Sequence, residues 1–210
     1  MFTGLVQAVG HVEAMKRNSS GGARLDLVTP QWVDRPSAGD SIAVDGCCLT
    51  VVESSSTDEE HYLLSFDVVQ QTLDKTVLGG FLPGRIVNLE TSATPETLLG
   101  GHLVQGHVDS VADVIQVDQE PGNVRIHFRV QKDLAELLVP QGSITIDGVS
   151  LTIAGVSGDQ FQVALIPTTL EWTNLGERRP GDQVNIESDI LLRSVRQLMV
   201  ARGILPATDQ

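Results

Sequence analysis

The chain carries one sequence pattern twice. The stretch AGDSIAVDGCCLTVV at 38–52 recurs as PQGSITIDGVSLTIA at 140–154, which is 102 residues further along. A second block, GRIVNLE at 84–90, recurs as GDQVNIE at 181–187 with an offset of 97, so about five residues have been lost from a loop. A repeat of roughly a hundred residues is too long for a solenoid unit and matches the size of a small domain. The sequence therefore predicts two homologous domains, 1–97 and 98–187, followed by a tail at 188–203.

Short apolar or alternating runs, separated by Gly, Pro, Ser and Asp, dominate both copies. Such runs predict five or six short strands per domain and an all-β fold, either an antiparallel barrel or a sandwich. The predicted strands are 24–28, 41–44, 49–53, 62–68 and 86–90 in the first copy, and 108–116, 124–130, 144–146, 151–156, 161–166 and 184–187 in the second. The Asp-Gly pairs at 45–46 and 147–148 lie between two runs, which predicts the same tight hairpin in each domain.

Helical patterns are few. Residues 132–138 predict about two turns, ended by Pro140. The stronger pattern is 188–203, where Ser188 or Asp189 can cap, an apolar stripe follows, and Gly203 ends the run. This helix has no counterpart after the first copy, so it either joins subunits or covers its own barrel. Residues 54–61 and 91–100 are expected to be solvated loop and linker.

The composition excludes several classes of function. The formal net charge of −13 would repel nucleic acid and anionic membrane surfaces, and neither is expected as a partner. The N-terminal segment lacks the basic and apolar regions of a secretion signal, and no apolar run is long enough to span a membrane, so a cytoplasmic location is expected. Cys47 and Cys48 are adjacent, which disfavours a disulfide between them. His102 and His107 lack further ligands at metal-site spacing, and no metal site is predicted.

Polar side chains on the repeated hairpin are the candidates for chemistry, because nucleotide-binding and common hydrolase motifs are absent. Alternation along a strand places Cys48 with Thr50, and Ser150 with Thr152, on one face. Each could be an ordinary strand residue, but their recurrence after the same turn indicates two pockets lined alike. Four further acidic positions stay open. Asp67 either faces solvent or binds a ligand and is replaced by alanine in the second copy, Glu90 and Glu187 could be surface residues, and Asp189 could be a helix cap.

These residues also carry a resemblance. The motifs MFTGLVQ, GDSIAVDGCCLTV, SFDVVQQTL, GGHLVQGHVD, GSITIDGVSLTI, LIPTTLEWTNLG and GDQVNIE closely resemble the riboflavin synthase family of lumazine-binding double-barrel proteins, in order and over nearly the whole chain. The resemblance implies two six-stranded antiparallel Greek-key β-barrels with a C-terminal helix that holds a homotrimer. It also implies that each barrel binds one 6,7-dimethyl-8-ribityllumazine. Two such molecules dismutate to riboflavin and 5-amino-6-(D-ribitylamino)uracil without cofactor or metal. Some relatives associate with lumazine synthase, and others in luminous bacteria bind lumazine or flavin as an antenna without turnover.

The resemblance also implies the substrate-binding residues, one set for each barrel. The first pocket is expected to comprise Gly4, Leu5, Val6, Cys48, Leu49, Thr50, Asp67, Val68, Val69, Gln70, Gln71 and Thr72. The second is expected to comprise Gly106, His107, Val108, Gln141, Ser150, Leu151, Thr152, Leu165, Ile166, Pro167, Thr168, Thr169 and Leu170. Ser150, His107 and Cys48 are the candidates for base and nucleophile, with roles left open. Gln141 stands where family members often carry lysine, so the missing positive charge bears on catalytic rate.

Overall fold

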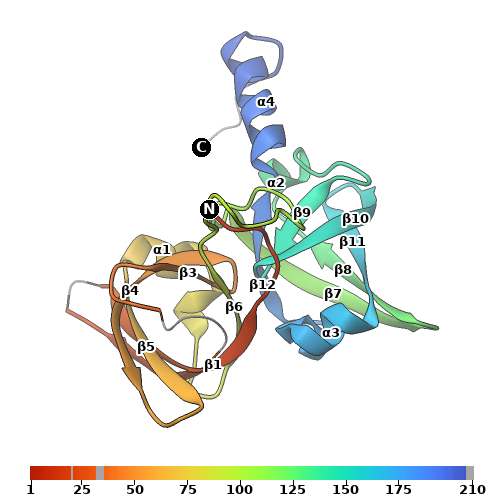
Figure 1. The fold of residues 1–210 in the computed structure, drawn as a ribbon. Helices are drawn as coiled ribbons and strands as arrows, with labels where there is room; N and C mark the ends of the chain where they lie inside the picture. Colours follow the sequence, from red (N-terminus) through yellow and green to blue (C-terminus); the bar gives the residue numbers. More distant parts are fainter. Residues whose placement is uncertain (20, 32–35, 207–210) are drawn as a thin grey trace.

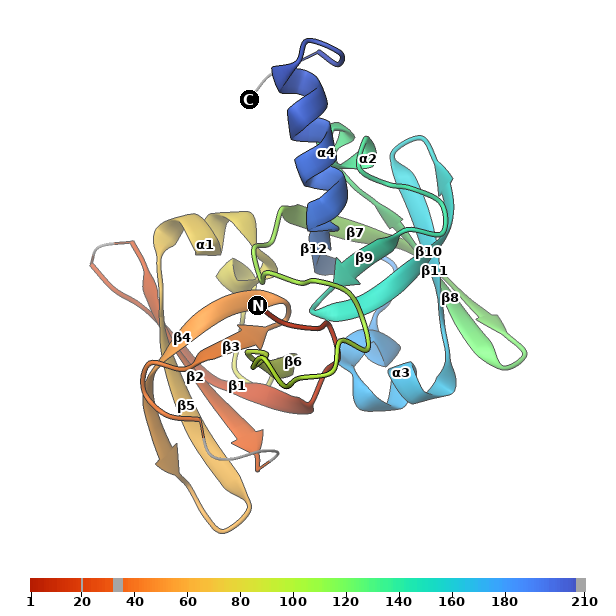
Figure 2. The same cartoon turned by 45° about the horizontal axis from the view of Figure 1, so that its top comes forward.

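Two closed, six-stranded antiparallel β-barrels follow one another along the chain, and a helix projects from the second barrel (Figure 1). The structure is a computed structural model that describes residues 1–19, 21–31 and 36–206. It confirms the all-β fold with two homologous barrels and a C-terminal helix. The barrels stand side by side, with the N-terminus between them (Figure 2).

The first barrel has the strand order β1-β2-β5-β4-β3-β6, so β2 pairs with β5 and β3 with β6 in a Greek-key arrangement. The second barrel repeats this order from β7 to β12. The strands of the first barrel are β1 (Ala8–Arg17), β2 (Ala23–Pro30), β3 (Ser41–Val44), β4 (Cys47–Ser56), β5 (His61–Val68) and β6 (Ile86–Thr91). Those of the second are β7 (Ser110–Glu120), β8 (Asn123–Arg129), β9 (Ser143–Ile146), β10 (Val149–Ser157), β11 (Gln160–Leu165) and β12 (Gln183–Ser188).

Two parts of the strand prediction were wrong. Strand β1 was missed because its apolar residues are sparse and its pairing with β2 shifts register between Val12 and Ala14, which breaks the two-residue alternation. The loop prediction for 54–61 was wrong at its start, because the polar residues 54–56 still pair with β5. Strands pair through their backbone and need apolar side chains only on the face toward the core, so polar residues can extend a strand.

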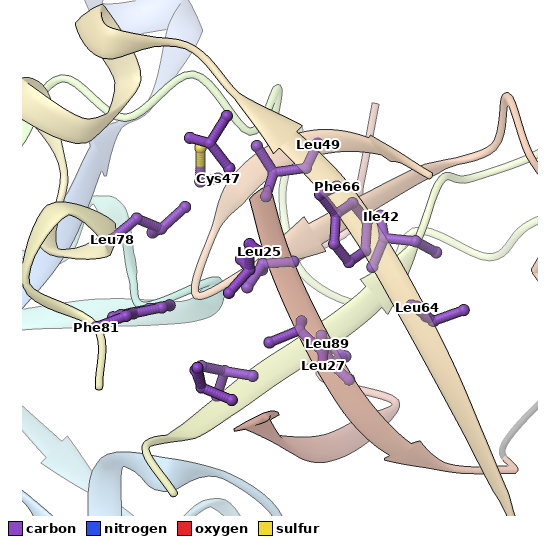
Figure 3. Packing of buried hydrophobic residues seen from close by; sticks show 14 of the residues in the cluster. Leu25, Leu27, Ile42, Cys47, Leu49, Leu64, Phe66, Leu78, Phe81 and Leu89 are labelled. Carbon is purple, nitrogen blue, oxygen red and sulfur yellow. The ribbon is translucent and has the colours of Figure 1, made fainter. Parts of the chain in front are cut away.

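Each barrel encloses its own apolar core. In the first barrel Leu25, Phe66 and Leu89 meet inside the strands, and Leu78 and Phe81 close one end (Figure 3). The matching core of the second barrel includes stacked Phe128 and Phe161, whose ring centroids lie 5.1 Å apart. Two separate cores explain why each repeat can form a barrel of its own.

Short helices close the barrel ends. They are α1 (Gln70–Lys75) with the 3-10 helix η1 (Val77–Gly80), and α3 (Pro167–Trp172) with η2 (Asn174–Glu177). Thr76 and Thr173 link the two helices of each pair, since each hydroxyl donates to the carbonyl four residues back and accepts the N–H two residues on. These elements are too short for a helical repeat to reveal them in the sequence.

The two predicted helices are present but shorter than expected. Helix α2 covers Lys132–Ala135, and α4 covers Ile190–Ala201 with the Asp189 side chain accepting the N–H of Leu191, which confirms the cap. The Arg196 guanidinium on α4 pairs with Glu136 beside α2. Leu191, Val195 and Leu198 on α4 are exposed in the single chain. Within the described part of the chain, no helix is both long and apolar enough to cross a membrane.

The repeated hairpin turns meet each other at the centre of the molecule. Asp45 and Gly46 have φ of 43° and 77°, and Asp147 and Gly148 have 44° and 81°, which confirms the predicted turns. A Cβ added to Gly46 would lie 2.6 Å from the backbone nitrogen of Gly148, so only glycine allows this approach. The interface between the barrels is therefore built around the repeated turn.

Buried amides and acids join the barrels around these turns. The Asn88 side chain donates to the carbonyl of Asp147 and that of Asn185 to the carbonyl of Asp45, both at 2.8 Å. Arg178 forms an ion pair of 2.9 Å with Asp147, whereas Phe81 occupies its position in the first copy. Among the described residues, Asp45 consequently has no cation in hydrogen-bond contact. Burial, together with the negative charge of Asp147, raises the pKa of Asp45 to about 8.

Candidate functional site

Two extended segments cross between the barrels (Figure 2). We call residues 2–7 the N-terminal arm and residues 102–108 the linker arm. The arms run antiparallel, because the N–H of Phe2 donates to the Val104 carbonyl at 2.7 Å and the N–H of Val104 donates back at 3.1 Å. Each arm leads into the first strand of its own barrel, β1 or β7, but its glycine, Gly4 or Gly106, contacts the other barrel.

Hydrogen bonds fix where each arm lies. The Gly4 carbonyl of the N-terminal arm accepts the N–H of Ser150 in the second barrel at 2.7 Å. The Gly106 carbonyl of the linker arm accepts the N–H of Cys48 in the first barrel at 2.9 Å. Val6 accordingly packs on the second core and Val108 on the first.

The predicted grouping of the pocket residues was therefore wrong. Gly4 to Val6 lie at the second barrel with Ser150, and Gly106 to Val108 lie at the first barrel with Cys48. The repeat offset shows which segments correspond to each other, but it carries no information on which barrel a segment contacts. Ser150 of the second barrel is thus contacted by the arm that leads into the first barrel, and Cys48 of the first barrel by the arm that leads into the second.

Glycine is required where each arm meets the opposite barrel. Gly4 and Gly106 have φ of 75° and 77°, in the left-handed region. A Cβ on Gly4 would lie 2.6 Å from the Ser150 Cβ, and one on Gly106 would lie 2.6 Å from the Cys48 Cβ. The backbone of each arm thus lies so close to Ser150 or Cys48 that no side chain fits between them.

A shallow pocket of about 170 Å³ lies where the linker arm meets the first barrel. Six of its lining residues were predicted, although three of those six were assigned to the other pocket. The lining residues are Cys47, Cys48, Gln71, Thr72, Lys75, Thr76, Gly106, His107 and Val108. The sequence prediction missed Cys47, Lys75 and Thr76. Lys75 and Thr76 lie three and four residues after Thr72, at the end of α1, a spacing that would have found them once the helix was known.

Other predicted residues of the first set lie outside this pocket. Asp67 is exposed and forms an ion pair of 3.0 Å with Arg24. Leu49 and Val68 belong to the core, and Val69 is exposed at the start of α1. The remaining two are exposed, namely Thr50 on β4 and Gln70 on α1, whose side chain donates to Asp74.

At the second barrel the Ser150 hydroxyl contacts a histidine that the sequence prediction had not paired with it. The His102 Nδ1 lies 2.7 Å from Ser150 Oγ, and Nε2 lies 3.2 Å from Thr145 Oγ1. Burial lowers the pKa of His102, so the imidazole is neutral at neutral pH. A neutral imidazole held between two hydroxyls can take up or release a proton at Nδ1. No spacing motif connects these residues, because the pair forms only when the linker arm folds back on β9 and β10.

The other residues predicted for the second pocket are divided between the core and the surface. Leu165 is buried in the core, and Leu151 and Leu170 pack on its edge. Thr152 on β10 and Ile166, Pro167 and Thr168 at the start of α3 are exposed, and Thr169 is half-buried. Gln141 lies in an exposed turn before β9 with φ of 66°. His102 and His107 lie at different pockets, and the described residues contain no group of three or more His, Cys, Asp or Glu arranged to hold a metal.

Glu90 and Glu187 are not surface residues. They are 4% and 2% exposed, on β6 and β12, and their carboxylates bind the two arms. The interpretation of these glutamates as exposed strand ends was wrong, because a strand end can be covered by a segment that is distant in sequence.

Comparisons with known proteins agree with this double architecture. The model of the lumazine binding domain matches residues 3–92 and again residues 105–189. The chain is 39% identical over 207 residues to the riboflavin synthase of Mycobacterium tuberculosis, covering 97% of this chain and 100% of that protein. The chain belongs to the riboflavin synthase family. Further members of this lumazine-binding family are the riboflavin synthases of Bacillus subtilis, 37% identical over 91% of this chain and 86% of that protein, and of Photobacterium phosphoreum, 36% identical over 95% and 89%.

Solved structures of similar fold contain ligands. LumP complexed with riboflavin has a TM-score of 0.79 and 29% identity, covering 90% of this chain and 99% of that one. LumP complexed with 6,7-dimethyl-8-(1'-D-ribityl) lumazine has a TM-score of 0.76 at the same identity and coverage. The double barrel of this chain is thus similar to proteins that bind lumazine and flavin.

Proposed function

We propose that this chain catalyses the riboflavin synthase reaction, the dismutation of two 6,7-dimethyl-8-ribityllumazine molecules to riboflavin and 5-amino-6-(D-ribitylamino)uracil. Similarity over the whole length of curated riboflavin synthases supports this transferase activity. The duplicated pocket fits a reaction that consumes two copies of one substrate. Holding both copies in place removes an entropic cost that reaches about 7–11 kcal/mol in well-oriented systems.

The observation that carries the proposal is the contact between His102 and Ser150 at one pocket only. The reaction needs a proton removed from the acidic 7-methyl group of one lumazine. In the tautomer with Nε2–H donating to Thr145, Nδ1 accepts the Ser150 hydroxyl proton. The methyl C–H bond then breaks, its electron pair delocalises into the lumazine ring, and the proton passes through Ser150 to His102. The first pocket, whose polar rim includes Cys48 and His107, binds the second lumazine. Water or a side chain then adds to this second molecule.

The assembly follows from the same proposal. The exposed apolar stripe of α4, formed by Leu191, Val195 and Leu198, joins subunits into a homotrimer. The productive pair of substrates then forms between the first barrel of one subunit and the second barrel of a neighbour. The protein acts in the cytoplasm, and association with a lumazine synthase capsid is a further expectation from the family. The domain limits at 97 and 187 belong to this proposal, and proteolysis between 91 and 100 tests the first of them.

Turnover of the substrate tests the function directly. The purified protein is incubated with 6,7-dimethyl-8-ribityllumazine, and riboflavin is followed by absorbance while lumazine is quantified by chromatography. The proposal predicts one riboflavin for each two lumazines consumed. Tight lumazine binding without riboflavin would instead make the chain a binding protein similar to LumP.

A further inference from the structure

We infer that Glu90 and Glu187 are positioning residues that each fix an arm of their own barrel against the substrate pocket of the opposite barrel. Their role in substrate binding rests on the proposed function, whereas their role in holding the arms does not. Neither carboxylate is among the residues that line the described pocket of the first barrel, and each acts through the backbone of the arm it binds.

Glu90 on β6 of the first barrel holds the N-terminal arm. One carboxylate oxygen accepts the N–H of Thr3 at 2.6 Å and its hydroxyl at 2.8 Å, and the other accepts the N–H of Gly4 at 3.0 Å. The next contact of Gly4 is with the second barrel, where its carbonyl accepts the N–H of Ser150. A carboxylate of the first barrel therefore fixes the backbone that lies against Ser150.

Glu187 on β12 of the second barrel holds the linker arm in the equivalent way. Its oxygens accept the N–H groups of Gln105 at 2.7 Å, Gly106 at 2.8 Å and His107 at 2.9 Å. The Gly106 carbonyl then accepts the N–H of Cys48, and the His107 side chain lines the first pocket. A carboxylate of the second barrel thus fixes the rim of the first pocket.

The chemistry of these contacts requires a carboxylate. Each glutamate accepts three hydrogen bonds from its arm, through both oxygens. Glutamine has the same shape but only one acceptor oxygen, so its amide nitrogen would face an N–H group of the arm. Replacing the acceptor by a donor removes at least one charge-assisted bond and leaves a buried donor unpaired.

Burying the two carboxyl groups is unfavourable for their charged form, and a barrel could form without them. Burial raises the pKa of both Glu90 and Glu187, while the arm N–H groups lower it in opposition. Both repeats have a buried carboxylate at this strand end. We explain this by the arm that each carboxylate binds, since each arm supplies the rim of a pocket.

Alkylation of Cys48 tests the crossed assignment without any substrate. Cys48 lies under the linker arm, and burial raises the pKa of both thiols, that of Cys47 to about 12, which keeps Cys47 unreactive. Full-length Glu187→Gln, Glu90→Gln and the exposed control Glu59→Gln are treated with iodoacetamide over a range of pH, and tandem mass spectrometry locates the label. The limiting rates at high pH are compared, because the charge of Glu187 itself raises the pKa of Cys48. We expect Glu187→Gln to raise the Cys48 rate by about tenfold or more, because loss of one charge-assisted bond shifts an equilibrium by at least that factor. Glu90→Gln and Glu59→Gln are expected to match the wild type.

Equal Cys48 rates in Glu187→Gln and Glu59→Gln would overturn the inference. Equal acceleration by Glu187→Gln and Glu90→Gln would overturn the crossed assignment, because it would reflect general loosening. Hydrogen exchange of the wild-type chain keeps the test valid if a variant does not fold. The amides of residues 3–4 and 105–107 are expected to exchange at least about a hundredfold more slowly than free peptide, and exchange at the free rate would contradict the hydrogen bonds to the glutamates.

Activity provides the second readout. In a chain that makes riboflavin, both Glu→Gln variants at 90 and 187 are expected to raise KM for the lumazine about tenfold, with Glu59→Gln unchanged. An unchanged KM would overturn the role in substrate binding. Absence of riboflavin from the wild type would instead count against the proposed function, while the Cys48 and exchange measurements would still decide how the arms are held.

Discussion

The two barrels have the same strands in the same order, yet their pockets carry different groups. At the first barrel Cys48 lies beside His107 and Lys75. At the second, Ser150 contacts His102, and Trp172 replaces the lysine. Duplication thus conserved the scaffold that holds two similar molecules, while the side chains diverged. The pockets can bind the same compound and treat it differently.

The two repeats also differ at a residue behind the pocket-lining side chains. Thr145, which contacts the far nitrogen of His102, corresponds to the apolar Ala43 in the first barrel. Ala43 therefore offers no hydroxyl at the position from which Thr145 contacts the imidazole of His102. Proton removal is assigned to the second pocket on this difference, and the following substitutions test it in order of expected effect.

The largest effect is expected from Ser150→Ala. Removing the hydroxyl interrupts proton transfer to His102, and such a step contributes about 10²–10⁴-fold to a rate. We expect kcat to fall by at least about a hundredfold, with KM changed by a factor of a few, in steady-state assays of riboflavin formation. Cys48→Ala is the matched control in the other pocket and is expected to lose much less. Equal losses in the two variants would make the pockets equivalent.

His102→Gln is expected to have the next largest effect. Glutamine can keep a hydrogen bond to Ser150 but takes up no proton, so kcat should fall about 10–100-fold. Burial lowers the pKa of His102 below the ordinary value of 6.5, so wild-type kcat should stay level through neutral pH and fall only in more acidic buffer, as the imidazole becomes protonated. The variant should lack this acidic fall. A pH profile of the variant that matches the wild type would remove His102 from the mechanism.

In the proposed homotrimer, separating the subunits should separate the two pockets that are proposed to react together. Leu198 on α4 is 64% exposed, and Leu198→Glu places a charge in the apolar stripe. We expect sedimentation to show loss of the trimer, and the specific activity to fall by about tenfold or more because the substrates lose their fixed orientation. Gln197→Glu, on another face of the same helix, is the control. A monomeric Leu198→Glu variant with full activity would place the reacting pair within one chain.

The last comparison concerns stability, and here the same substitution should act differently in the two repeats. The pKa of Asp45 in the fold is about 8 against an ordinary 3.8, so the folded state keeps a proton that the unfolded state releases. Its contribution to the free energy of unfolding is therefore full below pH 4 and is lost as the pH rises to about 8, with a slope of at most about 1.4 kcal/mol per pH unit. Asp45→Asn should remove this slope in urea denaturation at pH 5 and 8.5.

Asp147→Asn supplies the contrast. It leaves the buried Arg178 without its ion pair, a loss of about 3–5 kcal/mol in comparable cases. We expect this variant to be less stable than the wild type across the whole pH range. Equal denaturation profiles for the two variants would mean that Arg178 does not distinguish the turns.

Local chemistry decided what could be predicted from the sequence. The Asp-Gly turns follow from the positive φ that Gly46 and Gly148 tolerate, and the repeat itself predicts two domains of one kind. The chemical face of the hairpin was also predictable, because alternation places Cys48 and Ser150 on one side of their strands. These features depend only on residues close together in the chain.

Contacts between distant segments could not be predicted in this way. The crossing of the arms, the pairing of His102 with Ser150, and the burial of Glu90 and Glu187 all depend on where a segment lies after both barrels have formed. The sequence offset matches Gly4 with Gly106 but is equally compatible with arms that stay on their own barrel. The sequence therefore did not predict which segments would meet at each barrel.

Exchange of the 7-methyl protons of 6,7-dimethyl-8-ribityllumazine into D₂O tests the central claim most directly. Proton NMR follows the methyl signal with wild-type protein, Ser150→Ala and Cys48→Ala, and the rate without protein is subtracted. The assignment of proton removal to the second barrel predicts that catalysed exchange is lost in Ser150→Ala and retained in Cys48→Ala. Exchange that survives in Ser150→Ala and disappears in Cys48→Ala would contradict it.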